Sequence, residues 1–133
     1  MRAAGAVVLV ALLALVVGCG EREQPDDQAL HQDIVSGTGN VEVTFDATIT
    51  TEPAESGGHE RFNVKDPAGD SLEVDHNTTL AHSVPAHVGD ALIIHGQLYI
   101  DPGPHAGVHC THATTSSGCP DPGWIEFAGN YYE

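Results

Sequence analysis

The sequence predicts an all-β fold, a small antiparallel barrel of five to six strands behind an N-terminal leader. Three observations support this prediction. Apolar and polar residues alternate with a period of two in several short runs, which is typical of half-buried strands. Clusters of Gly, Pro and Asp separate these runs and indicate turns. No segment shows a sustained helical period.

The first strand is the clearest, because Val41, Val43, Phe45, Ala47 and Ile49 alternate with polar residues over residues 41–50. A loop with proline and paired glycine follows at 51–58, and turns are expected at 66–70, 89–90 and 103–107. The remaining strands are expected at 59–64, around Leu72 and Val74, at 92–100 with a bulge or bend at Gly96, around Val108 and Cys110, and at 124–128.

The order of these strands favours an OB-fold-like barrel. Two long strands, a shorter third, an irregular connection and two further strands match the five-stranded Greek-key barrel of that fold. An immunoglobulin-like sandwich would need about seven strands. We therefore expect one OB-like domain over residues 34–133.

The N-terminus has the features of a lipoprotein signal peptide over residues 1–18. Arg2 precedes an apolar run from Ala3 to Val17 that is shorter than the roughly 20 residues of a spanning helix. The run ends in Val16-Val17-Gly18-Cys19, which resembles a lipobox. We expect lipidation at Cys19, a flexible tether over residues 19–33, and attachment to the outer membrane or the cell membrane, on its extracytoplasmic side.

Charge argues against a nucleic-acid partner. The chain has 19 acidic residues and four Lys and Arg, with a formal net charge of −15. Nucleic-acid binding depends on Lys and Arg neutralising phosphates. The expected partners are instead the membrane, through the anchor, and an unknown small molecule, glycan or envelope protein.

Cys110 and Cys119 remain once Cys19 is assigned to the anchor. An even pair in an oxidising compartment favours a disulfide that closes the Ser-, Thr- and Gly-rich loop between them. The alternative is metal binding, because both cysteines lie near histidines.

An ordered set of short motifs carries a family resemblance: His59-x-Arg61-Phe62, Asp75-His76-Asn77, Gly89-Asp90, His109-x-x-His112 and Gly123-Trp124-Ile125. Together they resemble a family of small exported bacterial proteins that are known only as a domain of unknown function. The resemblance covers roughly residues 37–132 and implies an OB-type barrel in an exported protein, with no established activity. This chain has Cys110 where that family more often has tryptophan.

Nine histidines stand out in a chain with so few bases. Strand parity places His59, Arg61, His95, Tyr99 and His109 on the outer face, while His76 ends a strand and His112 follows one. His59, His76, His109 and His112 are candidate ligands for Zn²⁺ or Cu²⁺. Asp75 is expected either to bind the metal directly or to form a hydrogen bond that orients one of the histidines. The alternative for His59 and His76 is that they form hydrogen bonds to turns.

Three further residues are candidates for ligand binding. Arg61 can anchor an anionic group, or pair with Glu73 or Glu60. Tyr99 and Trp124 can stack on a ligand, although Trp124 can also cap the barrel.

No motif of a known catalytic class is present in the sequence. The first hypothesis is therefore a membrane-anchored lipoprotein with an OB-like binding module. A histidine-coordinated metal-dependent hydrolase and a structural envelope protein are the alternatives.

Overall fold

The computed structural model describes residues 20–103 and 105–133. The expected signal peptide and its lipidation site Cys19 lie outside these residues and stay predictions. Among the residues that the structure describes, no helix is long and apolar enough to cross a membrane. The elements are α1 (Asp27–Ser36), β1 (Val41–Ile49), β2 (Ala54–Ser56), β3 (His59–Lys65), β4 (Ser71–Asn77), β5 (Ala91–Asp101), β6 (His105–His109), β7 (Trp124–Phe127) and β8 (Asn130–Tyr132).

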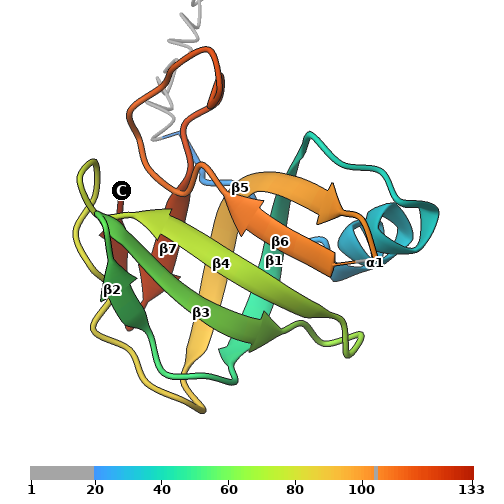
Figure 1. Ribbon diagram of the computed structural model, residues 1–133, viewed down its shortest axis with the longest axis horizontal. Helices are drawn as coiled ribbons and strands as arrows, with labels where there is room; N and C mark the ends of the chain where they lie inside the picture. Colours follow the sequence, from blue (N-terminus) through green and yellow to red (C-terminus); the bar gives the residue numbers. More distant parts are fainter. Residues whose placement is uncertain (1–19, 104) are drawn as a thin grey trace, which may run out of the picture.

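Five strands close into a barrel in the order β1-β3-β4-β6-β5, and pairing between β1 and β5 completes the circle (Figure 1). All pairs in this circle are antiparallel except β4 and β6, which run parallel, with Leu72 opposite Ala106 and Val74 opposite Val108. This order and the one parallel pair are those of an OB-fold barrel. The all-β, OB-like prediction is confirmed, but the barrel is mixed rather than purely antiparallel.

The barrel is extended at two edges. β2 pairs with β3 and forms a short hairpin where the sequence predicted only a loop. β7 pairs with the first half of β5, and β8 pairs with β7. The long strand β5 therefore contacts β1 along one side and divides its other side between β6 and β7.

The core is built by the inward side chains of the alternating strands, as the period of two predicts. Those with no more than 1% of their surface exposed include Phe45, Val64, Val74, Ile94, Leu98, Val108 and Ile125. Gly96 lies where two backbones approach, since an added Cβ would be 2.4 Å from the carbonyl oxygen of His109. This close approach explains the glycine that the sequence singled out in this strand.

The flexible tether predicted for residues 19–33 is wrong in its second half. Asp26 caps α1 by accepting a hydrogen bond from the Ala29 amide at 3.0 Å, and Gly37 ends the helix with a positive φ of 71°. Leu30 projects from α1 into the core with none of its surface exposed. The folded unit therefore begins before residue 34, because burial of Leu30 fastens the helix to the barrel.

Candidate functional site

The outer surface of β3, β4, β6 and β5 forms a continuous polar face. It includes the outer side of the second and third barrel strands, β3 and β4, where OB-fold barrels bind their ligands. Strand alternation places every second side chain outward here, and the register sets neighbours side by side. Hereafter "the polar face" means these seven residues: His59, Arg61, Glu73, Asp75, Gln97, Tyr99 and His109.

Tyr99 is the centre of the polar face. Its hydroxyl donates a hydrogen bond to Glu73 at 3.1 Å, and its ring contacts the ring of His109 edge to face, with centroids 5.4 Å apart. The ring lies over Gly107, where an added Cβ would be 2.1 Å from the Tyr99 ring carbon Cζ. The glycine thus provides the space that lets the tyrosine lie flat across the sheet.

Hydrogen bonds continue on both sides of Tyr99. Nε2 of His109 lies 3.0 Å from the Gln97 side-chain oxygen. On β4, one oxygen of Asp75 lies 2.6 Å from Nδ1 of His59, and the other accepts from Arg61 at 3.3 Å. The sequence proposed Glu73 or Glu60 as the partner of Arg61; the partner is Asp75, which lies directly opposite it in the register.

The electrostatics of this face favour neutral donors and acidic acceptors. Burial lowers the pKa of His109, against a smaller raising effect of Asp75, and nearby His112 lowers it further. Burial also raises the pKa of Tyr99, and the charge of Glu73 raises it further, so the hydroxyl stays protonated. At neutral pH the face therefore offers a phenol and a neutral imidazole beside two carboxylates.

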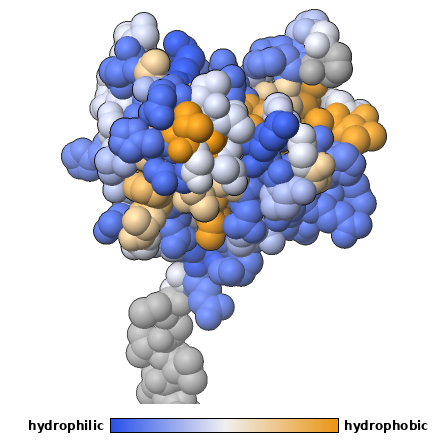
Figure 2. All heavy atoms as spheres, turned by 90° about the horizontal axis from the view of Figure 1, so that it is seen from below, coloured by the Kyte–Doolittle hydropathy of each residue, from blue (hydrophilic) through white to orange (hydrophobic). Residues whose placement is uncertain are grey.

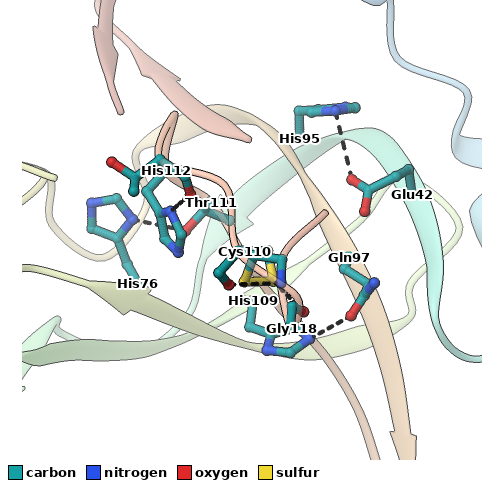
Figure 3. Close-up of a disulfide and its surroundings, with 12 residues drawn as sticks. Glu42, His76, His95, Gln97, His109, Cys110, Thr111, His112 and Gly118 are labelled. Carbon is teal, nitrogen blue, oxygen red and sulfur yellow. Dashed lines mark hydrogen bonds and ion pairs between the residues drawn. A yellow bond between two sulfur atoms is a disulfide. The ribbon is translucent and has the colours of Figure 1, made fainter. Parts of the chain in front are cut away.

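The four histidines proposed as metal ligands have separate partners. His76 is fully buried near the C-terminal end of β4. Its Nδ1 lies 2.8 Å from the Thr111 hydroxyl, and its Nε2 lies 2.9 Å from the His82 carbonyl oxygen. His112 is also buried and its Nδ1 lies 2.8 Å from the Thr114 carbonyl oxygen. His76 and His112 lie near one another, while His109 points to Gln97 (Figure 3).

Within residues 20–103 and 105–133, no group of three or more His, Cys, Asp or Glu side chains is arranged to hold a metal ion. Nδ1 of His59 already bonds to Asp75, and both ring nitrogens of His76 are occupied. The Zn²⁺ or Cu²⁺ hypothesis therefore gains no support from the geometry of the four candidates.

Cys110 and Cys119 form the predicted disulfide, with their Cα atoms 5.4 Å apart. Cys110 directly follows β6 and lies in the left-handed region with φ of 56°, which turns the chain out of the sheet. The bond thereby closes the loop that projects from the barrel between β6 and β7 (Figure 1).

Trp124 lies away from the polar face, on the side of the barrel where the N-terminal segment docks. Only 6% of its surface is exposed, because His95 stacks on it at 5.6 Å and Tyr131 packs against it edge to face. The guanidinium of Arg22 lies 5.5 Å from the Trp124 ring and 3.7 Å from the Tyr131 ring. Of the three proposed ligand-binding residues, Arg61 and Tyr99 lie on the polar face, and Trp124 is covered.

We call this side the docked side, because Arg22 and Glu23 of the N-terminal segment lie over it. It includes His95, which the sequence placed on the outer face. His95 does point out of the barrel, but only 6% of its surface is exposed. Its Nδ1 lies 2.7 Å from the Thr44 hydroxyl and 3.2 Å from Glu23 of the N-terminal segment. Burial lowers the pKa of His95, against the raising effects of Glu23 and Asp121.

Glu42 faces His95 at 3.7 Å without a hydrogen bond, and both of its carboxylate oxygens are buried and unpartnered in the described structure (Figure 3). Burial, and then the charges of Asp121 and Glu23, raise its pKa to about 7. Sequence reasoning missed this pair, because Glu23 and Asp121, which lie close to it, are distant from Glu42 and His95 in the sequence.

The similarity found to known proteins is with solved structures. No family model matches the sequence, and no curated protein matches it. The solved structure of the second single-stranded DNA binding protein (SSBb) from Mycobacterium smegmatis is similar, with 17% sequence identity and a TM-score of 0.45. The match covers 67% of this chain and 89% of that one. We draw nothing about ligands from it; the chain is an OB-fold-like barrel on the strength of its own strand order and pairing.

Proposed function

We propose that this chain is an extracytoplasmic lipoprotein, anchored through Cys19, whose barrel binds an oligosaccharide on the polar face. The observation that carries the proposal is the arrangement of Tyr99 among hydrogen-bonding neighbours on the ligand-binding side of an OB-fold-like barrel.

OB-fold barrels use this face for oligonucleotides and oligosaccharides. The net charge of −15 opposes the first class, because phosphates and the protein would repel one another. Sugar hydroxyls, in contrast, can donate to the carboxylates of Glu73 and Asp75 and to the Gln97 amide oxygen. The exposed part of the Tyr99 ring offers an apolar surface for a sugar ring.

The binding proposal is tested on a glycan array with the wild-type domain and two variants, Tyr99→Ala and Glu73→Gln. We expect binding to a restricted group of oligosaccharides and its loss by about tenfold or more in each variant. Trp124→Phe is the matched control, because Trp124 lies outside the polar face. Binding that survives both variants, or binding to oligonucleotides instead, would contradict the proposal.

Anchoring is tested separately by metabolic labelling with a clickable fatty acid in a bacterial host. We expect label on the wild-type chain and none on Cys19→Ser, which should be released from the membrane fraction. Label that is retained in Cys19→Ser would refute anchoring at this residue and leave the binding proposal intact.

A further inference from the structure

The N-terminal segment that precedes α1 is bound to the barrel along its length. Arg22 makes two hydrogen bonds to Glu133, which follows β8, at 2.6 and 3.0 Å. Glu23 accepts a hydrogen bond from the Thr44 hydroxyl at 3.2 Å. Next to α1, the Asp26 amide donates to the Thr44 carbonyl oxygen at 2.8 Å. The chain is therefore held against the docked side from Arg22 onward, and these residues do not act as a flexible spacer.

The proposed anchor is close in the chain to this bound segment. Cys19 precedes Arg22 by three residues, and an extended chain spans at most about 3.6 Å per residue. A lipid on Cys19 would hold Arg22 within roughly 11 Å of the lipidated residue. A folded chain of this length is about 35 Å across, so this connection is short compared with the barrel. The docked side must therefore stay near the bilayer as long as Arg22 is bound.

The disulfide loop, residues 110–123 between β6 and β7, stands out from the barrel on the same side (Figure 1). Burial, and then the charges of Asp121 in this loop and of Glu23, raise the pKa of Glu42. Both acids therefore lie close to Glu42, which brings the loop next to the N-terminal segment. Apart from Asp121, the loop contains no Lys, Arg, Asp or Glu. Its Ser, Thr and Gly residues can enter a headgroup layer at little electrostatic cost.

An exposed aromatic side chain lies on this side as well. Tyr131 of β8 has 40% of its surface exposed, and the Arg22 guanidinium lies 3.7 Å from the centroid of its ring. Tyrosine is enriched at the membrane–water interface, because its ring is apolar and its hydroxyl is polar. The guanidinium has further N–H donors that can reach a lipid phosphate. Tyr131 and Arg22 thus indicate the same membrane-facing surface independently of the length of the connection.

We propose that the docked side and the disulfide loop face the phospholipid headgroups of the membrane, so that the barrel rests directly on the bilayer. The inference rests on the proposed anchoring at Cys19 and adds the orientation of the barrel to it. The short connection imposes this contact, because Glu23 and Asp121 give the side an acidic character that anionic lipids do not attract. The polar face then recognises ligands within about 35 Å of the membrane.

The test uses the chain after the proposed cleavage, residues 19–133, on phosphatidylcholine nanodiscs. Its only free thiol is that of Cys19, because Cys110 and Cys119 are joined. Cys19 can therefore be coupled to a maleimide lipid whether or not a cell lipidates it.

A small fraction of gadolinium-labelled headgroups in the nanodisc broadens the NMR signals of nearby backbone amides. We expect the signals of residues 115–118, in the disulfide loop, to be lost. Those of residues 87–90, in the turn before β5 at the opposite end of the barrel, should be retained (Figure 1). Equal broadening at both ends, or stronger loss at residues 87–90, would overturn the proposal.

Two variants show whether the bound segment sets the orientation. A Gly-Ser linker of about 12 residues, inserted between Gly20 and Glu21, leaves the docked contacts in place and adds about 20 Å of average reach. The selective loss of signal at residues 115–118 should then disappear. Arg22→Ala combined with Glu23→Gln frees the segment without lengthening it and should also reduce the loss.

Lys65→Ala at the end of β3 is the matched control and should keep the wild-type pattern. A pattern that neither the linker nor the double substitution changes would overturn the proposal. The labelling experiment with Cys19→Ser separates the two failures. Absence of label on the wild-type chain would refute the anchoring itself, whereas a labelled chain with uniform broadening would refute only the orientation.

Discussion

The polar face and the docked side are both outward surfaces of the same barrel, but the first is partly exposed and the second is buried by the N-terminal segment. On the polar face, side chains from neighbouring strands pair with one another and stay partly exposed. On the docked side, Arg22 and Glu23 of the N-terminal segment reach over the strands and bury His95. The polar face, whose side chains pair only between neighbouring strands, stays accessible to a ligand. The docked side is not accessible, because a segment distant in the sequence covers it.

Exposed hydrophobic side chains come from several parts of the chain. The surface in Figure 2 is largely hydrophilic, with separate hydrophobic spots rather than one broad apolar patch. The large exposed hydrophobic side chains are those of Val35, Leu80, Val88 and Tyr131. Recognition by this barrel should therefore depend on polar groups such as those of the polar face.

The largest loss of stability is expected from a substitution at Gly123, where the disulfide loop joins the docked side. A Cβ added at Gly123 would be 1.9 Å from the Cys110 carbonyl oxygen and 2.7 Å from that of His95. Because both obstacles are backbone, Gly123→Ala should destabilise the fold by about 3 kcal/mol or more, measured by chemical unfolding. Gly118→Ala is the control, since its nearest atom is 4.0 Å away. Equal stabilities would contradict the packing described here.

A second prediction concerns Glu42, whose pKa is raised to about 7 from 4.5 by burial and by the neighbouring acids Asp121 and Glu23. Between these two pH values the folded chain binds more protons than the unfolded chain, so this group lowers stability as pH rises and its full penalty applies above about pH 7. Glu42→Gln removes that penalty. We expect the variant to be more stable than wild type by about 2 kcal/mol at pH 8 and nearly equal to it at pH 4.5.

Thermal unfolding of both proteins across this pH range measures the effect of Glu42. His95, which faces Glu42, is present in both proteins, so its own titration largely cancels in the difference. Glu21→Gln is the control variant, because it removes one carboxylate at an exposed position. If the difference in stability between Glu42→Gln and wild type were constant with pH, the Glu42 carboxyl group would not be desolvated in the folded chain.

A third prediction compares two arginines, one on each surface. Arg22 makes two hydrogen bonds to Glu133, at 2.6 and 3.0 Å, and lies against Tyr131 and Trp124. Because its side chain is 34% exposed, we expect Arg22→Ala to cost only about 1 kcal/mol. Arg61→Ala, which loses one exposed contact to Asp75, should cost less.

The fluorescence of Trp124 reports on the same comparison, because it is the only tryptophan of the chain. Its emission should shift in Arg22→Ala and stay constant in Arg61→Ala. Identical emission in both variants would mean that the N-terminal segment does not cover this side in solution.

A similarly small effect on stability is expected from Tyr99→Phe. The substitution removes the hydroxyl that donates to Glu73 and keeps the ring over Gly107. It should lower stability by about 1 kcal/mol or less while weakening oligosaccharide binding. Tyr132→Phe is the control at the edge of the barrel. A Tyr99→Phe variant that binds like wild type would restrict the role of Tyr99 to its ring.

Strand alternation explains why the polar face was largely predictable. The period of two placed Arg61, Tyr99 and His109 outward, and the order of strands suggested the barrel. The inward direction of His76 follows from the same alternation continued to the end of β4, where Leu72 and Val74 also point inward.

The covering of the docked side could not be predicted from local patterns, because it depends on contacts between segments that are far apart in the sequence. Arg22 and Glu133 are 111 residues apart, and no periodicity links them. The helix α1 carried a readable signal in Asp26 and Gly37 as its two caps, with Leu30 and Ile34 four residues apart. The helix was not predicted, because it is short and lies among charged residues that are typical of a flexible tether.

The most direct test of the division between the two surfaces is an amide chemical-shift map of the barrel with the best-binding oligosaccharide from the array. The account predicts shifts clustered at Arg61, Glu73, Asp75, Gln97, Tyr99 and His109, with the Trp124 indole signal unmoved. Shifts centred on Arg22 and Trp124, or no oligosaccharide that binds at all, would contradict the assignment of the polar face as the binding surface.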